Sequence, residues 1–333
     1  MDIQYLETGS TDPCFNLAAE ETVLRSRRQG TILMLWQNDR TIVIGQNQNA
    51  EEEINRPFVE KMGIRVVRRI TGGGAVYHDL GNLNYSLIAD AGNDNSLSIT
   101  RFTRPVAAAL RGLGLNAEAS GRNDILVDGR KVSGTAQRLL DGRILHHGTL
   151  LFDSDLDMVA GALRPDPSKF QSKSSKSVRS RVTNIRPLLR EDMSLEEFKT
   201  CLKLSLAAAA GEAGWSECPL TPAEKRAAET LADEKYRTWA WTYGRSPAFT
   251  YRNRRRFSGG SLEVRAAVEH GKISDIRFYG DFLSLAPLDP LTEALKGVPF
   301  QRAQVASVLK ACSLSTLFGG ISQSEVQIGR AHV

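Results

Sequence analysis

Residues 68–79 read Arg68-Arg69-Ile70-Thr71-Gly72-Gly73-Gly74-Ala75-Val76-Tyr77-His78-Asp79, at the end of the predicted strand Ile64–Ile70. Three consecutive glycines carry no Cβ, so backbone N–H groups in such a turn can approach an anion closely. The guanidinium of Arg69 suits a phosphate. A bare glycine triplet also fits a tight structural turn, but the flanking residues favour a phosphate-binding loop. The stretch has neither the Gly-Lys-Ser/Thr of a Walker loop nor the spacing of a dinucleotide fingerprint.

A second polar stretch, Gly121–Gly134, reads Gly-Arg-Asn-Asp-Ile-Leu-Val-Asp-Gly-Arg-Lys-Val-Ser-Gly. Its Asp128-Gly129 pair predicts a hairpin turn. That turn sets Lys131 at the start of the returning strand, where its ammonium can reach a phosphate or a carboxylate. From the residues alone, an exposed lysine at a strand edge is an equally good interpretation.

Adjacent histidines, His146 and His147, occur within a third predicted strand. Neighbouring residues of a strand point to opposite faces, so both cannot line one pocket, and a metal pair is disfavoured. We expect one of them to be packed in the core. The cysteines are scattered along the chain, which predicts neither a disulfide framework nor a zinc site. They are Cys14, Cys201, Cys218 and Cys312.

The first 152 residues contain more strand than helix signals, and the helices fall outside the strand runs. This order predicts an α+β fold, a mixed sheet with flanking helices rather than a βαβ repeat. The predicted elements are a helix from Pro13 after the capping Asp12, a β-hairpin of Thr31–Trp36 and Thr41–Gly45, strands at Ile64–Ile70, Leu83–Ala89, Ile125–Val127, Lys131–Arg138 and Ile144–Phe152, and a helix at Ile99–Leu113.

The second half changes character and predicts a small α+β accessory domain at its end. We expect a catalytic domain over residues 1–245 and the accessory domain over 246–327. The last six residues, 328–333, match a reading frame of a common sequencing adapter and are treated as an artefact. The predicted elements are a basic loop at Lys169–Arg181, helices at Ser194–Ala210 and Pro222–Tyr236, a crossover at Trp239–Ser258, a hairpin of Ser261–Glu269 and Ile273–Tyr279, and helices at Leu291–Lys296 and Arg302–Cys312.

Charge is concentrated in one segment. The chain of 333 residues carries a formal charge of +5, whereas residues 164–190 alone carry +7, so the remainder sums to −2. Such a segment suits an anionic partner, although a solvated loop explains it equally well. No stretch reaches the ~18–20 apolar residues of a membrane span, and the N-terminus has no secretory pattern. We therefore expect a cytoplasmic protein that does not enter a membrane.

Together, the ordered motifs resemble those of the lipoate–protein ligase A family. The glycine stretch and residues 121–134 are followed by His146-His147-Gly148-Thr149 and by Ser-Val-x-Ser-Arg-Val-Thr-Asn-Ile at 177–185. The match begins near Phe15 and continues weakly through residues 241–247. The resemblance implies a catalytic domain like those of biotin ligases and class II aminoacyl-tRNA synthetases. It also implies that residues 169–181 form an adenylate-binding loop.

The resemblance further implies a two-step reaction, in which lipoate or octanoate and ATP give an acyl-adenylate and pyrophosphate, and an acceptor lysine then takes the acyl group. Lys131 is the implied catalytic residue, contacting both phosphate and acyl carboxyl. Mg²⁺ enters with ATP; no metal ligand is assigned, with Asp124 the carboxylate to consider, and no tightly bound cofactor is expected. The implied nucleotide-binding residues are Arg69, Gly74, Ala75, Val76, Tyr77 and Lys131, and the implied lipoate-binding residues are Trp36, Gly73, Gly74, Lys131 and His147.

The implied partners are apo lipoyl domains of 2-oxoacid dehydrogenase E2 subunits and the glycine-cleavage H protein, met by a monomeric enzyme. The main alternative is an octanoyl- or lipoyltransferase of the same superfamily that does not itself use ATP. Another is a transferase that accepts only preformed lipoyl-adenylate. A non-catalytic nucleic-acid-binding protein is disfavoured, because the basic segment at 169–190 contains only one aromatic residue, Phe170, for base stacking. We therefore expect no nucleic-acid partner.

Overall fold

The computed structural model describes residues 3–92, 99–120, 123–163, 181–209, 215–243, 251–322 and 325–326. Most of the predicted basic loop at Lys169–Arg181 lies outside these ranges, as do residues 328–333, and both predictions stay untested. None of the helices in the described ranges combines the length and apolar character that a membrane crossing requires.

A mixed sheet of eight strands forms the centre of the N-terminal part, in the order β11-β1-β2-β6-β10-β9-β8-β7. β1 is parallel to β11 and β2, and the other neighbours are antiparallel. The predicted mixed sheet is confirmed. The strands, in spatial order, are β11 Trp215–Glu217, β1 Ile3–Glu7, β2 Thr31–Trp36, β6 Asn82–Asp90, β10 Arg143–Leu151, β9 Arg130–Leu140, β8 Asp124–Val127 and β7 Ala117–Ser120.

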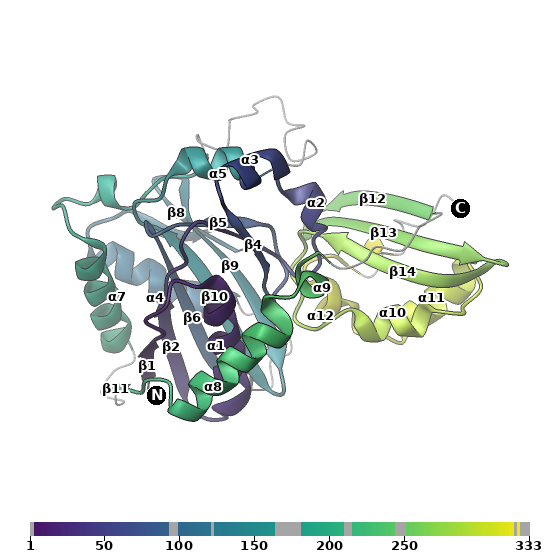
Figure 1. Ribbon diagram of the computed structural model, residues 1–333, viewed down its shortest axis with the longest axis horizontal. Coiled ribbons are helices and arrows are strands. Elements are labelled where there is room, and N and C mark those ends of the chain that lie inside the picture. The colour runs from purple at the N-terminus through teal and green to yellow at the C-terminus, as the bar shows by residue number, and fades with distance from the viewer. Residues whose placement is uncertain are drawn as a thin grey trace.

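Helices cover both faces of this sheet (Figure 1). On one face, α4 (Ile99–Gly112) and α7 (Leu195–Ala209) pack their apolar residues into the core. On the other face lie α1 (Pro13–Ser26) and α8 (Pro222–Leu231), which continues as the π-helical turn η3 (Ala232–Tyr236). The predicted helix starts are confirmed, because the Asp12 side chain caps α1 and a capping box begins α8.

A second, three-stranded sheet packs over the α1 face of the large one. β3 (Thr41–Ile44) is its centre, parallel to β4 (Arg65–Arg68) and antiparallel to β5 (Val76–His78). Val43, Val67 and Val76 turn toward the core shared with the large sheet. The outer face is covered by short helices, α2 (Ala50–Glu53), α3 (Arg56–Lys61) and α5 (Leu156–Ala162), and the 3₁₀ turn η2 lies at Arg186–Leu188.

The predicted hairpin of Thr31–Trp36 and Thr41–Gly45 is wrong. β2 pairs with β1 and β6, whereas β3 pairs with β4 and β5 in the other sheet. The connection between them is held by specific side-chain contacts, since Asn16 Nδ2 donates to the Gln37 carbonyl (2.8 Å) and to Asn38 Oδ1 (2.9 Å). The chain therefore crosses from one sheet to the other instead of reversing within one.

The C-terminal part has its own core, as the predicted small α+β domain requires. An antiparallel sheet of β12 (Tyr251–Phe257), β13 (Gly260–Glu269) and β14 (Lys272–Gly280) packs against three helices beside the larger part (Figure 1). The predicted β13–β14 hairpin is confirmed. The helices are α10 Asp289–Leu295, α11 Arg302–Lys310 and α12 Leu314–Phe318.

The predicted crossover at Trp239–Ser258 is partly wrong. Trp239–Thr242 forms a short helix, α9, and Tyr251–Phe257 is the edge strand β12. Residues 251–257 form a strand whose side chains alternate between partly buried and exposed positions, which is typical of a sheet edge rather than of a linker. The arginine-rich sequence obscured this alternation.

Among the described residues, three backbone hydrogen bonds join the two parts of the chain. Gly73 N donates to the Phe282 carbonyl (3.0 Å), Leu139 N to the Leu285 carbonyl (2.8 Å), and Gly280 N to the Asn47 carbonyl (2.7 Å). Leu283, between the first two contacts, is fully buried against Ile99 and Ala136. Residues 281–285 thus lie against the outer side of the glycine loop.

Candidate active site

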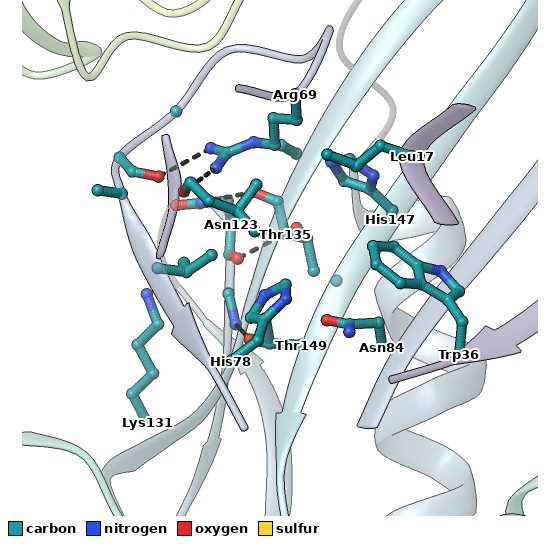
Figure 2. A pocket seen from close by; sticks show the side chains of 18 residues that line it. Leu17, Trp36, Arg69, His78, Asn84, Asn123, Lys131, Thr135, His147 and Thr149 are labelled. Carbon is teal, nitrogen blue, oxygen red and sulfur yellow. Dashed lines mark hydrogen bonds between the residues drawn. The ribbon is translucent and has the colours of Figure 1, made fainter. Parts of the chain in front are cut away.

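A cavity of about 100 Å³ lies between the two sheets of the N-terminal part. Figure 2 shows Lys131 at one end and Leu17 and Trp36 at the other, with His78 and Asn84 between them. The lining comes from α1, from the small sheet with its glycine loop, and from the large sheet. It consists of Leu17, Trp36, Val43, Arg69, Gly73, Gly74, Ala75, Val76, His78, Asn84, Asn123, Lys131, Gly134, Thr135, Ala136, His147, Gly148 and Thr149.

Arg69 is the buried centre around which the glycine loop folds. Its Nε donates to Thr71 Oγ1 (2.9 Å) and one Nη to the Val43 carbonyl (3.1 Å). The other Nη donates to the carbonyls of Gly72 (2.7 Å) and Gly74 (2.8 Å). Four of the five N–H groups of the guanidinium therefore hold protein atoms. In this structure Arg69 holds the glycine loop in shape. Its expected contact with the nucleotide stays a prediction.

The direction of these bonds orients the N–H groups of the loop. In a trans peptide the C=O and the following N–H point in opposite directions. Because the Gly72 and Gly74 carbonyls face Arg69, the N–H groups of Gly73 and Ala75 point away from it. That of Gly73 donates to Phe282. That of Ala75, a lining residue, lies in the segment expected to hold the nucleotide.

The consecutive glycines are needed for different reasons. A Cβ on Gly72 would lie 2.7 Å from the Phe282 carbonyl oxygen and 2.8 Å from Ser284 N, so the C-terminal part excludes a side chain there. Gly73 has φ +91°, a conformation that L-residues rarely adopt. The space beside Gly74 is open, with Asp281 Cβ at 4.0 Å. Gly74 is thus the position of the triplet at which a ligand could approach the backbone.

Arg68 lies outside the cavity and joins the loop region to α9. Its guanidinium donates to the carbonyls of Gly45 (2.9 Å), Gln48 (2.7 Å) and Thr242 (2.6 Å). Trp241 Nε1 in turn donates to the Arg68 carbonyl (2.8 Å). Burial lowers the pKa of Arg68 to about 10, which still leaves it charged at neutral pH. The two adjacent arginines therefore brace the loop from different sides.

Lys131 stands at the more exposed end of the cavity. Its Nζ forms an ion pair with Asp124 Oδ1 at 2.7 Å, and about a third of each side chain is exposed. The predicted turn between them is confirmed by positive φ at Asp128 (49°) and Gly129 (74°). β9 lies between β8 and β10, so Lys131 is not on an edge strand of the sheet.

Gly134 makes room for the lysine. A Cβ at Gly134 would lie 2.9 Å from Lys131 Nζ and 3.0 Å from its Cε. The Lys131 carbonyl also accepts a hydrogen bond from Thr183 N (3.0 Å), so the segment that follows residues 169–181 is fixed next to the lysine. The Lys-Val-Ser-Gly motif thus determines where the Lys131 ammonium group can lie.

Buried polar groups line the opposite end. Trp36 Nε1 donates to Ser86 Oγ (2.8 Å), and Ser86 Oγ donates to Glu20 Oε1 (2.5 Å). His147 Nδ1 lies 2.9 Å from the same carboxylate oxygen, and its Nε2 lies 2.8 Å from Thr71 Oγ1. The wall near Trp36 is thereby linked to the glycine loop.

His146 and His147 point to opposite faces of β10, as predicted. His147 lines the cavity, whereas His146 stacks on Phe102 with ring centroids 5.0 Å apart in the core under α4. Burial lowers the pKa of His146 to about 3. It therefore stays neutral at physiological pH, and its place on the opposite face of β10 prevents it from sharing a metal ion with His147.

His78 is a lining residue that the set of expected site residues omitted. Its Nδ1 lies 3.1 Å from Asn38 Nδ2, so Nε2 carries the proton, and within the described residues Nε2 is buried without a hydrogen-bond partner. Burial, with a contribution from Arg69, lowers the pKa of His78 to about 3. Asn84 Nδ2 is a second buried donor of this kind. Two neutral donors therefore face the cavity between its ends.

The structure brings together nearly all the residues expected at the site. Tyr77 differs, because its side chain points away from the cavity into the core under α2 and α3, leaving only its backbone near the loop. Asp124 does not line the cavity but holds Lys131. The missed residues Asn84 and Ser86 could have been found from the sequence, because they are polar at every second position of an otherwise apolar strand.

The cysteines lie away from the cavity. Cys14 Sγ lies 3.5 Å from the Tyr236 carbonyl, and burial raises the pKa of its thiol to about 11. A neutral thiol is a poor nucleophile. None of the four cysteines, all of which are in described positions, lines the cavity.

Two family models match the chain. The model of the lipoyl protein ligase A/B catalytic domain matches residues 12–207, and that of the bacterial lipoate protein ligase C-terminus matches residues 246–327. The chain is 42% identical over 315 residues to lipoate-protein ligase LplJ of Bacillus subtilis (strain 168), which covers 94% of this chain and 95% of that protein.

Solved structures agree with the sequence comparison. A lipoate-protein ligase A bound with ATP is 32% identical, with a TM-score of 0.64, covering 73% of this chain and 99% of that one. A bi-partite lipoate protein ligase of Thermoplasma acidophilum, described with its E2 lipoyl domain, is 33% identical, with a TM-score of 0.66, covering 75% and 100%.

Proposed function

The chain belongs to the lipoyl protein ligase A/B family, and from that premise we propose that it is an ATP-dependent lipoate–protein ligase. It activates lipoate, or octanoate, with ATP to an acyl-adenylate and transfers the acyl group to a lysine of a lipoyl domain. The relatives named as lipoate ligases, and the relative solved with ATP, support this proposal.

The observation that carries the proposal is the division of one cavity into an ionic end and an apolar end. Lys131, paired with Asp124 behind it, forms the first, and Leu17, Trp36 and Val43 form part of the second. A fatty acid has the same division, with a carboxylate at one end and an apolar chain. The glycine loop borders the cavity, so a nucleotide held there would meet the carboxylate.

The first step joins two anions, and the site must neutralise their charge. A carboxylate oxygen attacks the α-phosphorus of ATP, a C–O–P linkage forms, and the bond to pyrophosphate breaks. Lys131 Nζ stabilises the negative charge as it develops, while Asp124 keeps the ammonium in place. Mg²⁺ would enter as part of the ATP substrate, and Asp124, beside Lys131, is the carboxylate that could contact it.

The second step uses a lysine amine of the acceptor to attack the acyl carbonyl, with AMP as the leaving group. The apolar end holds the acyl chain, which fixes the position of the anhydride beside Lys131. The lipoyl domain described with the archaeal ligase makes such domains the expected acceptors. Apo E2 subunits and glycine-cleavage H protein are the acceptors we propose, with the enzyme acting as a monomer.

Lipoate-dependent exchange between ATP and labelled pyrophosphate, run without acceptor, tests the proposal. We expect exchange in the absence of acceptor and lipoylation of a lipoyl domain when one is added. Transfer from supplied lipoyl-adenylate or from an acyl carrier protein, without any exchange, would show a transferase instead. Salt-dependent RNA binding with neither activity would show a nucleic-acid-binding protein.

A further inference from the structure

A continuous path of hydrogen bonds passes through a carboxylate that has no part in the steps above. It runs from Trp36 through Ser86 to Glu20, and from Glu20 through His147 to Thr71. Glu20 lies on α1 and is only 1% exposed. The path therefore connects the acyl end of the cavity to the glycine loop through one buried charge.

The hydrogen bonds are consistent with one donor direction along this path. Thr71 Oγ1 accepts from Arg69 Nε, so its own O–H is left to donate to His147 Nε2. His147 then carries its proton on Nδ1 and donates it to Glu20. Ser86 donates to the same carboxylate. The Glu20 carboxyl group is thus the acceptor at the centre of the path.

The neighbouring Glu21 makes contacts of a different kind from those of Glu20. Glu21 is also buried, but it bonds to Lys235 Nζ (2.7 Å), Tyr236 Oη (2.6 Å) and Arg25 on the far side of the helix. Those contacts fasten α1 to η3. Glu20 bonds instead to Ser86 and His147, two residues of the large sheet that line or support the acyl end.

The charge of Glu20 also acts on the loop. Arg69 is buried, and burial lowers its pKa to about 10, while Glu20 is the carboxylate that opposes this lowering. Removing the charge would leave the Arg69 guanidinium without that support. Arg69 holds the carbonyls of Gly72 and Gly74, so the loop would lose part of what orders it.

We propose that Glu20 is a positioning residue that fixes His147 and Trp36 at the acyl end and, through Thr71 and Arg69, the glycine loop. The two substrates are thereby bound by one hydrogen-bonded unit, and the binding of each depends on the same carboxylate. This inference deepens the proposed ligase function and rests on it.

Glu20→Gln tests the proposal by keeping the shape of the side chain and removing its charge. The amide oxygen is neutral, so the bonds from Ser86 and His147 both lose their charged acceptor and weaken. We expect KM for lipoate and KM for ATP to rise together by about 10- to 100-fold, the size for losing hydrogen bonds to a buried charge. We expect kcat to change by less than about threefold.

Glu21→Gln is the matched control, since it removes a buried carboxylate one residue away. It should lower the melting temperature and leave both KM values unchanged. A purely structural role for Glu20 would give the same pattern as this control, with a smaller active fraction and unaltered KM values. That result in Glu20→Gln would overturn the proposal.

Thr71→Val breaks the path from its other end and serves if Glu20→Gln does not fold. It should raise both KM values, and Thr71→Ser should restore them because it keeps the hydroxyl. In the double variant with Glu20→Gln, Thr71→Val should raise the KM values little further, because both substitutions disrupt the same hydrogen-bonded path. Fully additive effects would show that the two residues act separately.

Nitrogen-15 NMR of labelled histidine gives a readout that does not depend on activity. We expect the Nδ1–H tautomer for His147 in the wild-type protein and a shift toward Nε2–H in Glu20→Gln; the His147→Gln spectrum assigns the signal. An Nε2–H tautomer in the wild type would contradict the path. Absence of lipoate-dependent exchange in the wild type would instead overturn the ligase function, so the two failures can be told apart.

Discussion

The two ends of the cavity are built on opposite principles. Lys131 and Asp124 are each about one-third exposed and form an ion pair with one another. At the other end Glu20, His147 and Trp36 are 9% exposed or less, and each is held by hydrogen bonds to the large sheet or the loop. One end keeps a charged group accessible, and the other fixes its groups in place.

This difference follows from what each end has to do. A group that neutralises developing charge must reach both a carboxylate and a phosphate, and a long solvated side chain can adjust to both. A group that shapes an apolar slot gains nothing by moving. Substitutions at the two ends should therefore affect different kinetic constants, kcat at the lysine end and KM at the buried end.

Lys131→Ala should give the largest effect. Loss of the ammonium should lower the rate of adenylation by at least about 100-fold, the usual loss for one donor that acts in the transition state. Lipoate-dependent pyrophosphate exchange measures this rate. Exchange at the wild-type rate in the variant would remove Lys131 from the mechanism.

Acidification should weaken the buried part of the molecule. The pKa values of His78 and His146 are lowered to about 3, whereas an unfolded histidine titrates near 6.5. The unfolded chain therefore binds more protons below pH 6.5, and stability present above that pH is lost as the pH falls. Each histidine contributes up to about 1.4 kcal/mol per pH unit.

Urea unfolding between pH 6.5 and 5 measures this loss before most carboxylates titrate. Replacing His146 with glutamine, which does not titrate, should remove about half of the pH dependence attributed to the two histidines. An equally steep dependence in His146→Gln would mean that His146 is protonated in the folded protein.

Gly134→Ala should disturb the lysine end without removing its charge. The new methyl group would lie 2.9 Å from Lys131 Nζ, so the tip of the lysine must move. We expect kcat for adenylation to fall about tenfold, because small displacements of a catalytic group are costly. Gly112→Ala is the control, since its Cβ would meet open space in α4. Equal activity of the two variants would show that the position of Lys131 is not critical.

Trp36→Phe should give the smallest effect and should appear at the buried end. It keeps an aromatic ring but loses the hydrogen bond from Nε1 to Ser86. We expect KM for lipoate to rise about threefold, as for a neutral hydrogen bond, with kcat unchanged. A change in kcat alone, measured with saturating lipoate, would show that the two ends are not separable in this way.

Local sequence signals predicted most of the elements but not how the sheets pair. The helix starts at Pro13 and Pro222, and the turn at Asp128-Gly129, depend on neighbouring residues and were found. The placement of Thr31–Trp36 and Thr41–Ile44 in different sheets depends on Asn16 and His78, which contact the connection from elsewhere in the chain. No local pattern contains that information.

The site divides in the same way. Lys131 and the glycine loop were found because their motifs are contiguous. Glu20 was missed because a glutamate in an apolar helix becomes meaningful only when His147, 127 residues away, is brought to it. The role of Arg69 in shaping the glycine loop was missed, because a guanidinium can bind a phosphate or backbone carbonyls and the sequence does not distinguish the two.

The hydrogen bond from Gly73 to Phe282 has a consequence for how the protein is made. The loop emerges from the ribosome some 200 residues before the segment that closes its outer side. Until residues 281–285 are synthesised and folded, Gly73 N–H lacks its acceptor and the tight approach at Gly72 has nothing to fit against. We expect nascent chains that have not yet produced these residues to hold ATP poorly, so activation would begin only when translation is nearly complete.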